Sequence, residues 1–193
     1  GTASTVRPWL LVENPGPWGI DALRDNRMPP GVKDELARTA EAAGVRVVLV
    51  RRHHRRAPRH GFRVFAAWAD ATDPWMEEAV LDDPEDLLDL DLGALARGRS
   101  VRLAPHYGHV WGACTHGKHD ACCAERGRPV AAALAEVSPE QAWECSHIGG
   151  DRFAPHVLVL PHGLYYGRLR PDAAGDLVAA HPAGRADVRP LRG

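Results

Sequence analysis

The sequence predicts an α/β protein built from two halves that repeat one order of elements: strand, helix, strand, strand, strand, helix. Apolar runs rich in β-branched residues alternate with segments whose apolar positions recur at helical spacing. This alternation occurs twice along the 193 residues, a length that can bury a core without disulfides. The formal net charge is −1, so the chain as a whole does not favour a nucleic acid or a membrane surface.

The first half is predicted to span residues 6–100. Its first strand is stopped by the loop Asn14–Gly19, which contains two prolines and two glycines. A helix follows, with Gly44 as its C-terminal stop. An acidic segment that opens at Leu81 predicts a second helix, because carboxylates stabilise a helix N-terminus. The strands are expected at 8–12, 45–50, 62–68 and 74–80, and the first helix at 32–43.

The second half is predicted to span residues 101–181. Its strands are expected at 109–113, 141–145, 156–160 and 164–169, and its helices at 125–137 and 172–180. Pro129 is expected in the first turn of its helix, where a missing N–H is tolerated. Residues 182–193 lack periodicity and predict an irregular tail. The order of elements in each half is thioredoxin-like.

All four cysteines lie in one stretch of the second half, before and after a predicted helix and strand. If that helix packs back on the sheet, the two groups of residues meet at one point. Thiolates and imidazoles together bind iron, zinc or copper(I). The stretch contains Cys114, Cys122, Cys123 and Cys145 together with His116, His119 and His147.

Residue types alone are compatible with several kinds of site. Two thiolates and two nitrogens suit a tetrahedral zinc ion or an iron–sulfur cluster with histidine on one iron. The eight residues between Cys114 and Cys123 exceed the usual spacing of structural zinc pairs and favour the bulkier cluster. Gly149 and Gly150 would let the backbone approach such a cofactor, and His116 is a further cofactor-binding candidate. Thiol–disulfide chemistry, or buried cysteines without a cofactor, are the other interpretations.

Two stretches, Cys114–Pro129 and Trp143–Gly167, together with Glu13–Gly19 near the start, resemble the sucrase/ferredoxin-like family. The resemblance covers nearly the whole chain. It implies a thioredoxin-like ferredoxin fold and a [2Fe-2S] cluster held by two cysteines and two histidines. The family pattern is Cys, eight to twelve residues, Cys, and a downstream His-x-Gly-Gly-His. On that match Cys114 and Cys123 would bind one iron and His147 the other, with Cys122 as the alternate to Cys123.

The sequence departs from the family pattern at Asp151, where the second histidine is expected. Three outcomes follow: Asp151 ligates through a carboxylate oxygen, Cys145 replaces the missing ligand, or the cluster is labile or absent. Cys145 is the preferred replacement, because a thiolate is the better iron–sulfur ligand.

The resulting hypothesis is an electron-transfer protein rather than an enzyme. Its alternatives are a cysteine-based thiol redox enzyme, a zinc-stabilised binding module, and a member without cofactor that serves as an interaction protein. The basic loop Arg51–His60 is expected to lie at the same edge as the cysteine site and to dock an acidic redox partner. No nucleic-acid partner is expected. A cytoplasmic location is expected, because the chain lacks an apolar run of about 18 residues and a signal-peptide pattern.

Overall fold

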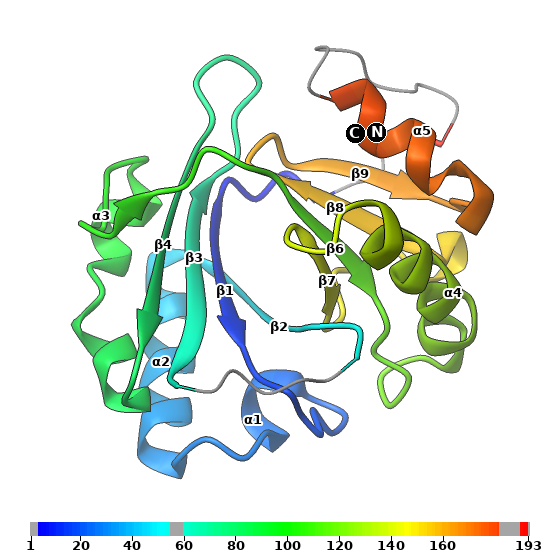
Figure 1. Ribbon diagram of the computed structural model, residues 1–193. Helices are drawn as coiled ribbons and strands as arrows, with labels where there is room; N and C mark the ends of the chain where they lie inside the picture. The colour runs from blue at the N-terminus through cyan, green and yellow to red at the C-terminus, as the bar shows by residue number, and fades with distance from the viewer. Residues whose placement is uncertain (1–3, 55–59, 182–189, 193) are drawn as a thin grey trace.

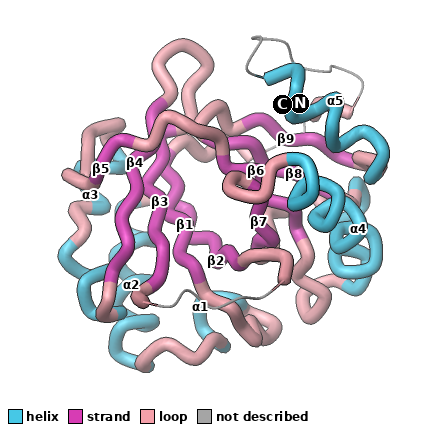
Figure 2. Tube along the Cα trace, viewed as in Figure 1, coloured by secondary structure: helices cyan, strands magenta, loops and turns pink. Residues whose placement is uncertain are grey.

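The computed structural model describes residues 4–54, 60–181 and 190–192 and shows a mixed α/β fold with a curled sheet (Figure 1). Nine strands of these residues form the sheet in the order β5-β4-β3-β1-β2-β7-β6-β8-β9. Figure 2 shows the strands in the interior and the helices around the outside. The strands are β1 Pro8–Glu13, β2 Arg46–Arg51, β3 Phe62–Trp68, β4 Trp75–Leu81, β5 Ala104–Pro105, β6 Val110–Cys114, β7 Ala142–Cys145, β8 His156–Leu160 and β9 Leu164–Gly167.

The helices lie between these strands in both halves of the chain. The α-helices are α1 Ala22–Asp25, α2 Pro30–Ala43, α3 Leu92–Ala96, α4 Ala121–Val137 and α5 Ala174–Ala180. Short 3₁₀ helices are η1 Pro84–Asp89, η2 Asp151–Phe153 and η3 Pro171–Ala173. Among the described residues, no helix is long and apolar enough to cross a membrane.

The strands of the two halves pair in the same scheme. In the first half β1 is parallel to β2 and antiparallel to β3, which is antiparallel to β4. In the second half β6 is parallel to β7 and antiparallel to β8, which is antiparallel to β9. The halves join where β2 pairs antiparallel with β7, through Val50 opposite Cys145 and Arg51 opposite Glu144.

Buried residues divide into three clusters according to the face of the sheet. One lies between the first-half strands and α2, and another lies between the second-half strands and α4 and α5. The third cluster lies on the opposite, inner face and contains strand residues from both halves, among them Trp9, Phe65 and Trp143. Cys114, Cys123 and Cys145 belong to this inner cluster, so the cysteine site is built into a core that the two halves share.

Helix α4 starts earlier than the sequence pattern predicts. It begins at Ala121, because the Asp120 side chain accepts a hydrogen bond from Cys122 N at 2.7 Å and caps the helix. The predicted start at residue 125 was therefore wrong, and Pro129 lies inside the helix instead of in its first turn. Burial of Val130 and the residues that follow it keeps the helix continuous beyond the proline.

The acidic segment after β4 forms η1 and then α3 instead of one helix. Asp83 and Asp86 make a capping box at the start of η1, and Asp91 caps α3 by accepting from Ala94 N. Each cap begins a separate short helix. The pattern also missed α1 and β5, which are four and two residues long and too short to show a periodicity.

The predicted tail lies partly outside the described residues, which omit 182–189. Its described end returns to the sheet beside β9. Gly167 N donates to Pro190 O at 2.9 Å, and Arg192 N donates to Tyr165 O at 2.8 Å. The segment 190–192 is thus paired with the edge of the second half. The sequence analysis, which expected an irregular tail, did not predict this pairing.

Candidate metal centre

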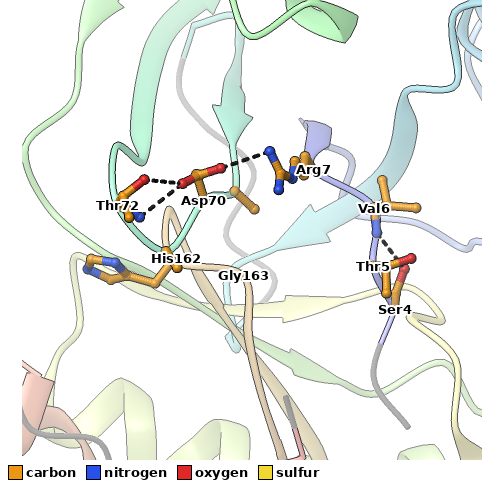
Figure 3. Close-up of a pocket in the computed structure, with 10 residues that line it drawn as sticks. Ser4, Thr5, Val6, Arg7, Asp70, Thr72, His162 and Gly163 are labelled. Atoms are coloured by element: carbon orange, nitrogen blue, oxygen red, sulfur yellow. Dashed lines mark hydrogen bonds and ion pairs between the residues drawn. The ribbon is translucent and has the colours of Figure 1, made fainter. Parts of the chain in front are cut away.

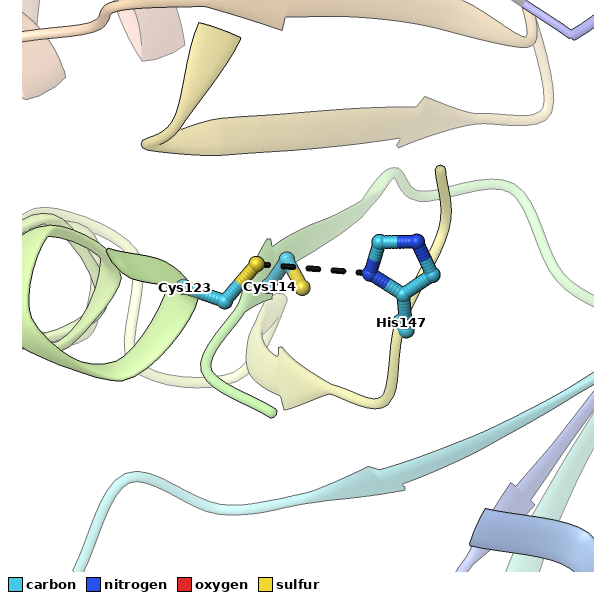
Figure 4. Close-up of side chains that lie close together, drawn as sticks. All are labelled: Cys114, Cys123 and His147. Atoms are coloured by element: carbon cyan, nitrogen blue, oxygen red, sulfur yellow. Dashed lines mark hydrogen bonds between the residues drawn. The ribbon is translucent and has the colours of Figure 1, made fainter. Parts of the chain in front are cut away.

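Three side chains meet at the inner end of α4. Cys114 is the last residue of β6, Cys123 lies in the first turn of α4, and His147 follows β7 (Figure 4). One donor atom from each lies within 4.8 Å of the other two, and among the described residues these are the only three that form such a group. Cys123 Sγ and His147 Nδ1 are 4.0 Å apart. Both cysteines are buried and His147 is half-buried, so the group is open to solvent on its histidine side.

The start of α4 determines which of the two adjacent cysteines faces the group. Successive residues on a helix point about 100° apart, so only one of them can face β6. Cys123 is 1% exposed and lies in the inner core. Cys122 is half-buried, and its side chain contacts Asp120, whose charge raises the pKa of the Cys122 thiol. Cys122 therefore lies away from the group.

Gly127 allows α4 to pack closely on the end of β6. It lies one turn after Cys123, on the same face of the helix. A Cβ at this position would lie 2.0 Å from the Cys114 carbonyl oxygen. Only glycine leaves room for this contact, which brings Cys123 to within reach of Cys114.

The pKa values of both buried thiols are raised. The hydrogen bond with Cys123 lowers the pKa of Cys114, but the contact with Cys145 and burial outweigh it and raise that pKa to about 12. The hydrogen bond with Cys114 and burial raise the pKa of Cys123, against the effect of His147. Reactive cysteines have lowered pKa values, so these two thiols are not activated nucleophiles.

Cys145 lies beside Cys114 on the neighbouring strand β7. The two residues are Cα partners in the parallel pairing of β6 and β7, and their side chains are in hydrogen-bond contact. Cys145 is 1% exposed. It adjoins the three-donor group through Cys114 without belonging to it.

His116 holds the backbone of His147 in place. Its Nδ1 accepts from His147 N at 3.2 Å, so Nε2 carries the proton and donates to Gly19 O at 2.8 Å. Burial lowers the pKa of His116, and the nearby imidazoles of His119 and His147 lower it further. Both ring nitrogens of this neutral imidazole bind the protein, which makes His116 a positioning residue.

His119 is the site residue that the sequence interpretation did not place among the ligands. Its exposed ring stacks on His147 with centroids 3.8 Å apart and an interplanar angle of 24°. The spacing His116-x-x-His119, next to the cysteine motif, is the sequence signal that could have identified this residue. The stack covers one face of the His147 ring.

The loop after β7 brings glycines and guanidinium groups beside the site. Gly149 and Gly150 have φ of +91° and +84°, values that favour glycine. A Cβ on Gly150 would lie 2.7 Å from Arg192 Nη1. Burial and the charge of Arg152 lower the pKa of Arg192. Asp151, the alternate ligand, begins η2, and its side chain lies outside the described residues.

Arginine side chains gather around Phe153 at the end of this loop. Arg192 lies over its ring at 3.7 Å, Arg152 at 5.0 Å and Arg168 at 5.3 Å. Arg46, at the start of β2, donates to His147 O at 3.5 Å. We call Arg46, Arg152, Arg168 and Arg192 the arginine surface. The metal group therefore lies beside a region of positive charge.

The basic loop begins beside the site, where Arg51 donates to Thr115 Oγ1, next to Cys114, at 3.5 Å. Its role as a docking surface stays a prediction. Because β2 and β7 are antiparallel, the chain that leaves β2 runs toward the start of β7. There Arg52 donates to the carbonyl oxygens of Pro139, Glu140 and Ala142 and lies 3.7 Å from the Trp143 ring. Residues 55–59 lie outside the described residues.

Arg51, the first residue of that loop, is buried and joins the two halves. Its guanidinium pairs with Glu144 at 2.7 Å, and the two side chains are 7% and 4% exposed. Thr115 Oγ1 donates to the same carboxylate at 2.8 Å. Burial raises the pKa of Glu144, but Arg51 and these hydrogen bonds outweigh it, so the net pKa is lowered. The sequence interpretation did not identify Glu144.

A cavity of about 800 Å³ lies on the other side of His116. The loop Asn14–Gly19 and the start of α4 line it, with Lys118 and Arg128 among the lining residues. Trp18 packs edge-on against His116, with centroids 5.8 Å apart. The Pro- and Gly-rich loop of the first half thus contacts the site through His116.

Comparison with solved structures gives two cysteine-to-serine variants of the thioredoxin-like [2Fe-2S] ferredoxin from Aquifex aeolicus. The first is 19% identical with a TM-score of 0.39, and the second is 21% identical with a TM-score of 0.38. Each alignment covers 45% of this chain and 99% of the other. These scores are too low to carry an argument about this chain. No curated protein matches it.

The family comparison covers almost the whole chain. The model described as sucrase/ferredoxin-like matches residues 1–189. The match includes the cysteine and histidine group, the loop Asn14–Gly19 and both halves of the sheet. The chain therefore belongs to the sucrase/ferredoxin-like family.

Proposed function

We propose that this protein is an electron carrier that holds a [2Fe-2S] cluster in its second half. The observation that carries the proposal is the convergence of Cys114, Cys123 and His147, whose donor atoms lie within 4.8 Å of one another. When bound, such a cluster accepts and donates single electrons.

The donor set fits this cofactor in kind. Two thiolates and one imidazole are ligands that iron–sulfur clusters use. We propose Cys145 as the fourth ligand, because it contacts Cys114 and lies in the same core. Its place outside the 4.8 Å group is compatible with a binuclear cofactor, since only ligands of the same iron need to lie that close. Asp151 remains the alternate.

The surrounding residues suit electron exchange at a surface. His147 is half-buried, and it connects the buried thiols with the exterior. The bond from His147 N to His116 keeps the loop in one conformation. The arginine surface offsets added negative charge at the site, and we propose it, together with the basic loop Arg51–His60, as the docking face for an acidic redox partner.

We also propose that the two halves, residues 6–100 and 101–181, are pseudo-repeated thioredoxin-like units. The support is the common pairing scheme, with strand orders β4-β3-β1-β2 and β9-β8-β6-β7. In this interpretation the first half has lost its metal ligands, and Arg51 takes the position beside the junction that Glu144 takes in the second half.

The test is an absorption spectrum with iron and acid-labile sulfide analysis on protein purified without oxygen. The proposal predicts visible cluster bands with two irons and two sulfides per chain. Cys114→Ser, Cys123→Ser and His147→Ala should each lose iron. Cys122→Ser is the matched control, because it changes the neighbouring thiol that faces away from the group. Colourless, iron-free protein after reconstitution would rule the cluster out.

A zinc-stabilised binding module is the second candidate. Three donors within 4.8 Å of one another are compact enough for a single tetrahedral ion with a fourth ligand. One equivalent of zinc and no iron in the same analysis would favour it. A thiol redox enzyme has less support, because the pKa values of Cys114 and Cys123 are raised.

A further inference from the structure

Three histidines from distant segments converge at the other end of β6 from Cys114. His109 directly precedes β6, His162 lies in the turn between β8 and β9, and His181 follows α5. Their ring centroids are 5.6 Å apart for His109 and His162, 5.6 Å for His109 and His181, and 6.4 Å for His162 and His181. We call these residues the three-histidine cluster.

The spacing of the rings corresponds to three imidazoles around one ion. A metal–nitrogen bond of about 2.0–2.1 Å places each ring centroid roughly 3.2 Å from the ion. At bond angles between tetrahedral and trigonal, the centroids then lie roughly 5.2–5.6 Å apart. Two of the observed separations match this range, and the third exceeds it by less than about 1 Å.

His181 has the surroundings of an oriented ligand. It is 8% exposed, and its Nε2 lies 2.9 Å from Tyr166 Oη. A metal-binding histidine usually has such a partner on its second nitrogen; here Nε2–H would donate to Tyr166 and Nδ1 would bind the ion. Trp111 packs edge-on against the His181 ring, with centroids 5.0 Å apart, which restricts its rotation.

Metal binding requires neutral imidazoles, and two rings of the cluster have lowered pKa values. Burial lowers the pKa of His181 to about 4, and the charges of His109 and His162 contribute. Burial, and then the charge of His162, also lower the pKa of His109. His181 therefore does not have to lose a proton near neutral pH before it can bind an ion.

His162 is the ring that must adjust. It is exposed at the turn Pro161–Gly163, and Figure 3 shows its ring on the side of the turn away from Arg7 and Val6. The donor nitrogens of the three rings do not all lie within 4.8 Å of one another as they stand, since the group at Cys114 is the only set among the described residues with that spacing. An exposed side chain changes rotamer within nanoseconds, so no large kinetic barrier keeps His162 from turning inward.

The cavity beside this turn offers no competing explanation. It has a volume of about 530 Å³ and is lined by residues 4–7 ahead of β1, by residues 69–72 and by the turn itself. Asp70 already pairs with Arg7 at 3.0 Å and accepts from Thr72 Oγ1 at 2.8 Å (Figure 3). The Asp70 carboxylate therefore already has partners within the protein.

We propose that His109, His162 and His181 form a second metal site, for a borderline divalent ion such as Zn²⁺. Three imidazoles and a water molecule would complete a tetrahedral ion, with the water on the exposed side of His162. The ion would connect the end of α5 to β6 and to the β8–β9 turn. This inference is independent of the proposed electron-carrier function.

The experiment is a Zn²⁺ titration of the full chain without an affinity tag, by equilibrium dialysis. The proposal predicts one more bound ion per chain for wild type than for His162→Ala or His109→Ala, or affinity at that site lower by at least about 100-fold. His54→Ala, a histidine outside the cluster, should bind as wild type does. Co²⁺ identifies the site that is filled, since ions at the cysteine group give a thiolate charge-transfer band and ions at the cluster do not.

Equal numbers of ions and equal affinities in wild type and both cluster variants would overturn the proposal. Position 162 is exposed, so His162→Ala keeps the fold and its result can be interpreted alone. His162→Gln, which preserves size, provides a second variant. Loss of the thiolate charge-transfer band in these variants would also count against the proposal, because it would mean that the ion had been at the cysteine group.

Discussion

Replacing Gly127 with alanine tests whether close packing of α4 on β6 builds the metal group. The added Cβ would lie 2.0 Å from the Cys114 carbonyl oxygen, where ordinary contact begins at 3.4 Å. The helix must therefore move outward locally by about 1.4 Å, and such overpacking costs about 1–3 kcal/mol. Metal–ligand distances tolerate deviations of only about 0.2 Å. Cys123 lies one turn away on the same helix face, so Gly127→Ala should also lose bound metal.

The assay combines urea unfolding, followed by tryptophan fluorescence, with metal analysis of the purified protein. Gly175→Ala is the matched control, because Gly175 lies in α5 and a Cβ there meets nothing within 4 Å. That control should be neutral or more stable by up to about 1 kcal/mol. If Gly127→Ala had the stability and the metal content of Gly175→Ala, the packing argument would be refuted.

Three further predictions follow from the site and its surroundings. Glu144→Gln leaves the buried charge of Arg51 unpaired and should destabilise the fold by about 3–5 kcal/mol in urea unfolding at pH 7. The folded-state pKa of Glu144 is lowered. The stability that its carboxylate contributes is therefore present above the unfolded carboxyl pKa of about 4.3 and is lost as pH falls below it. A mutational effect of equal size at pH 7 and pH 3 would contradict this. A thiol reagent should modify one cysteine rapidly in the native protein and all four after unfolding, and Cys122→Ser should remove the rapid reaction, since only Cys122 is accessible. Charge reversal at Arg152 and Arg168 should slow electron exchange with an acidic protein at low salt and weaken its salt dependence, whereas equal rates would remove the arginine surface as the docking face.

The sequence predicts the strands well where the signal is continuous. Strands β3 and β8 occur at the predicted residues, 62–68 and 156–160, because β-branched and aromatic runs bounded by turn residues have few other conformations. The start of α4 was predicted four residues late, since Pro129 was taken to mark the first turn. The local cap at Asp120 and the burial of the helix outweighed that preference.

The candidate site could be predicted in its residue types and less well in its geometry. Cys114, Cys123 and His147 were named as ligands, and the structure brings them together. The choice between the two adjacent cysteines depends on where α4 begins, which pattern does not determine. The pairing of Arg51 with Glu144 crosses 93 residues. Such a contact depends on how the two halves join, and no local pattern encodes it.

The junction of β2 and β7 has a consequence for strand register. Alternate residues of a strand face opposite sides of the sheet, so Glu144 and Cys145 lie on opposite faces of β7. A slip of one residue would turn the carboxylate into the inner core and the thiol away from Cys114. The ion pair between Arg51 and Glu144 forms only in the observed register. The first half thus acts as a template that selects the alignment in which the second half can assemble its metal site.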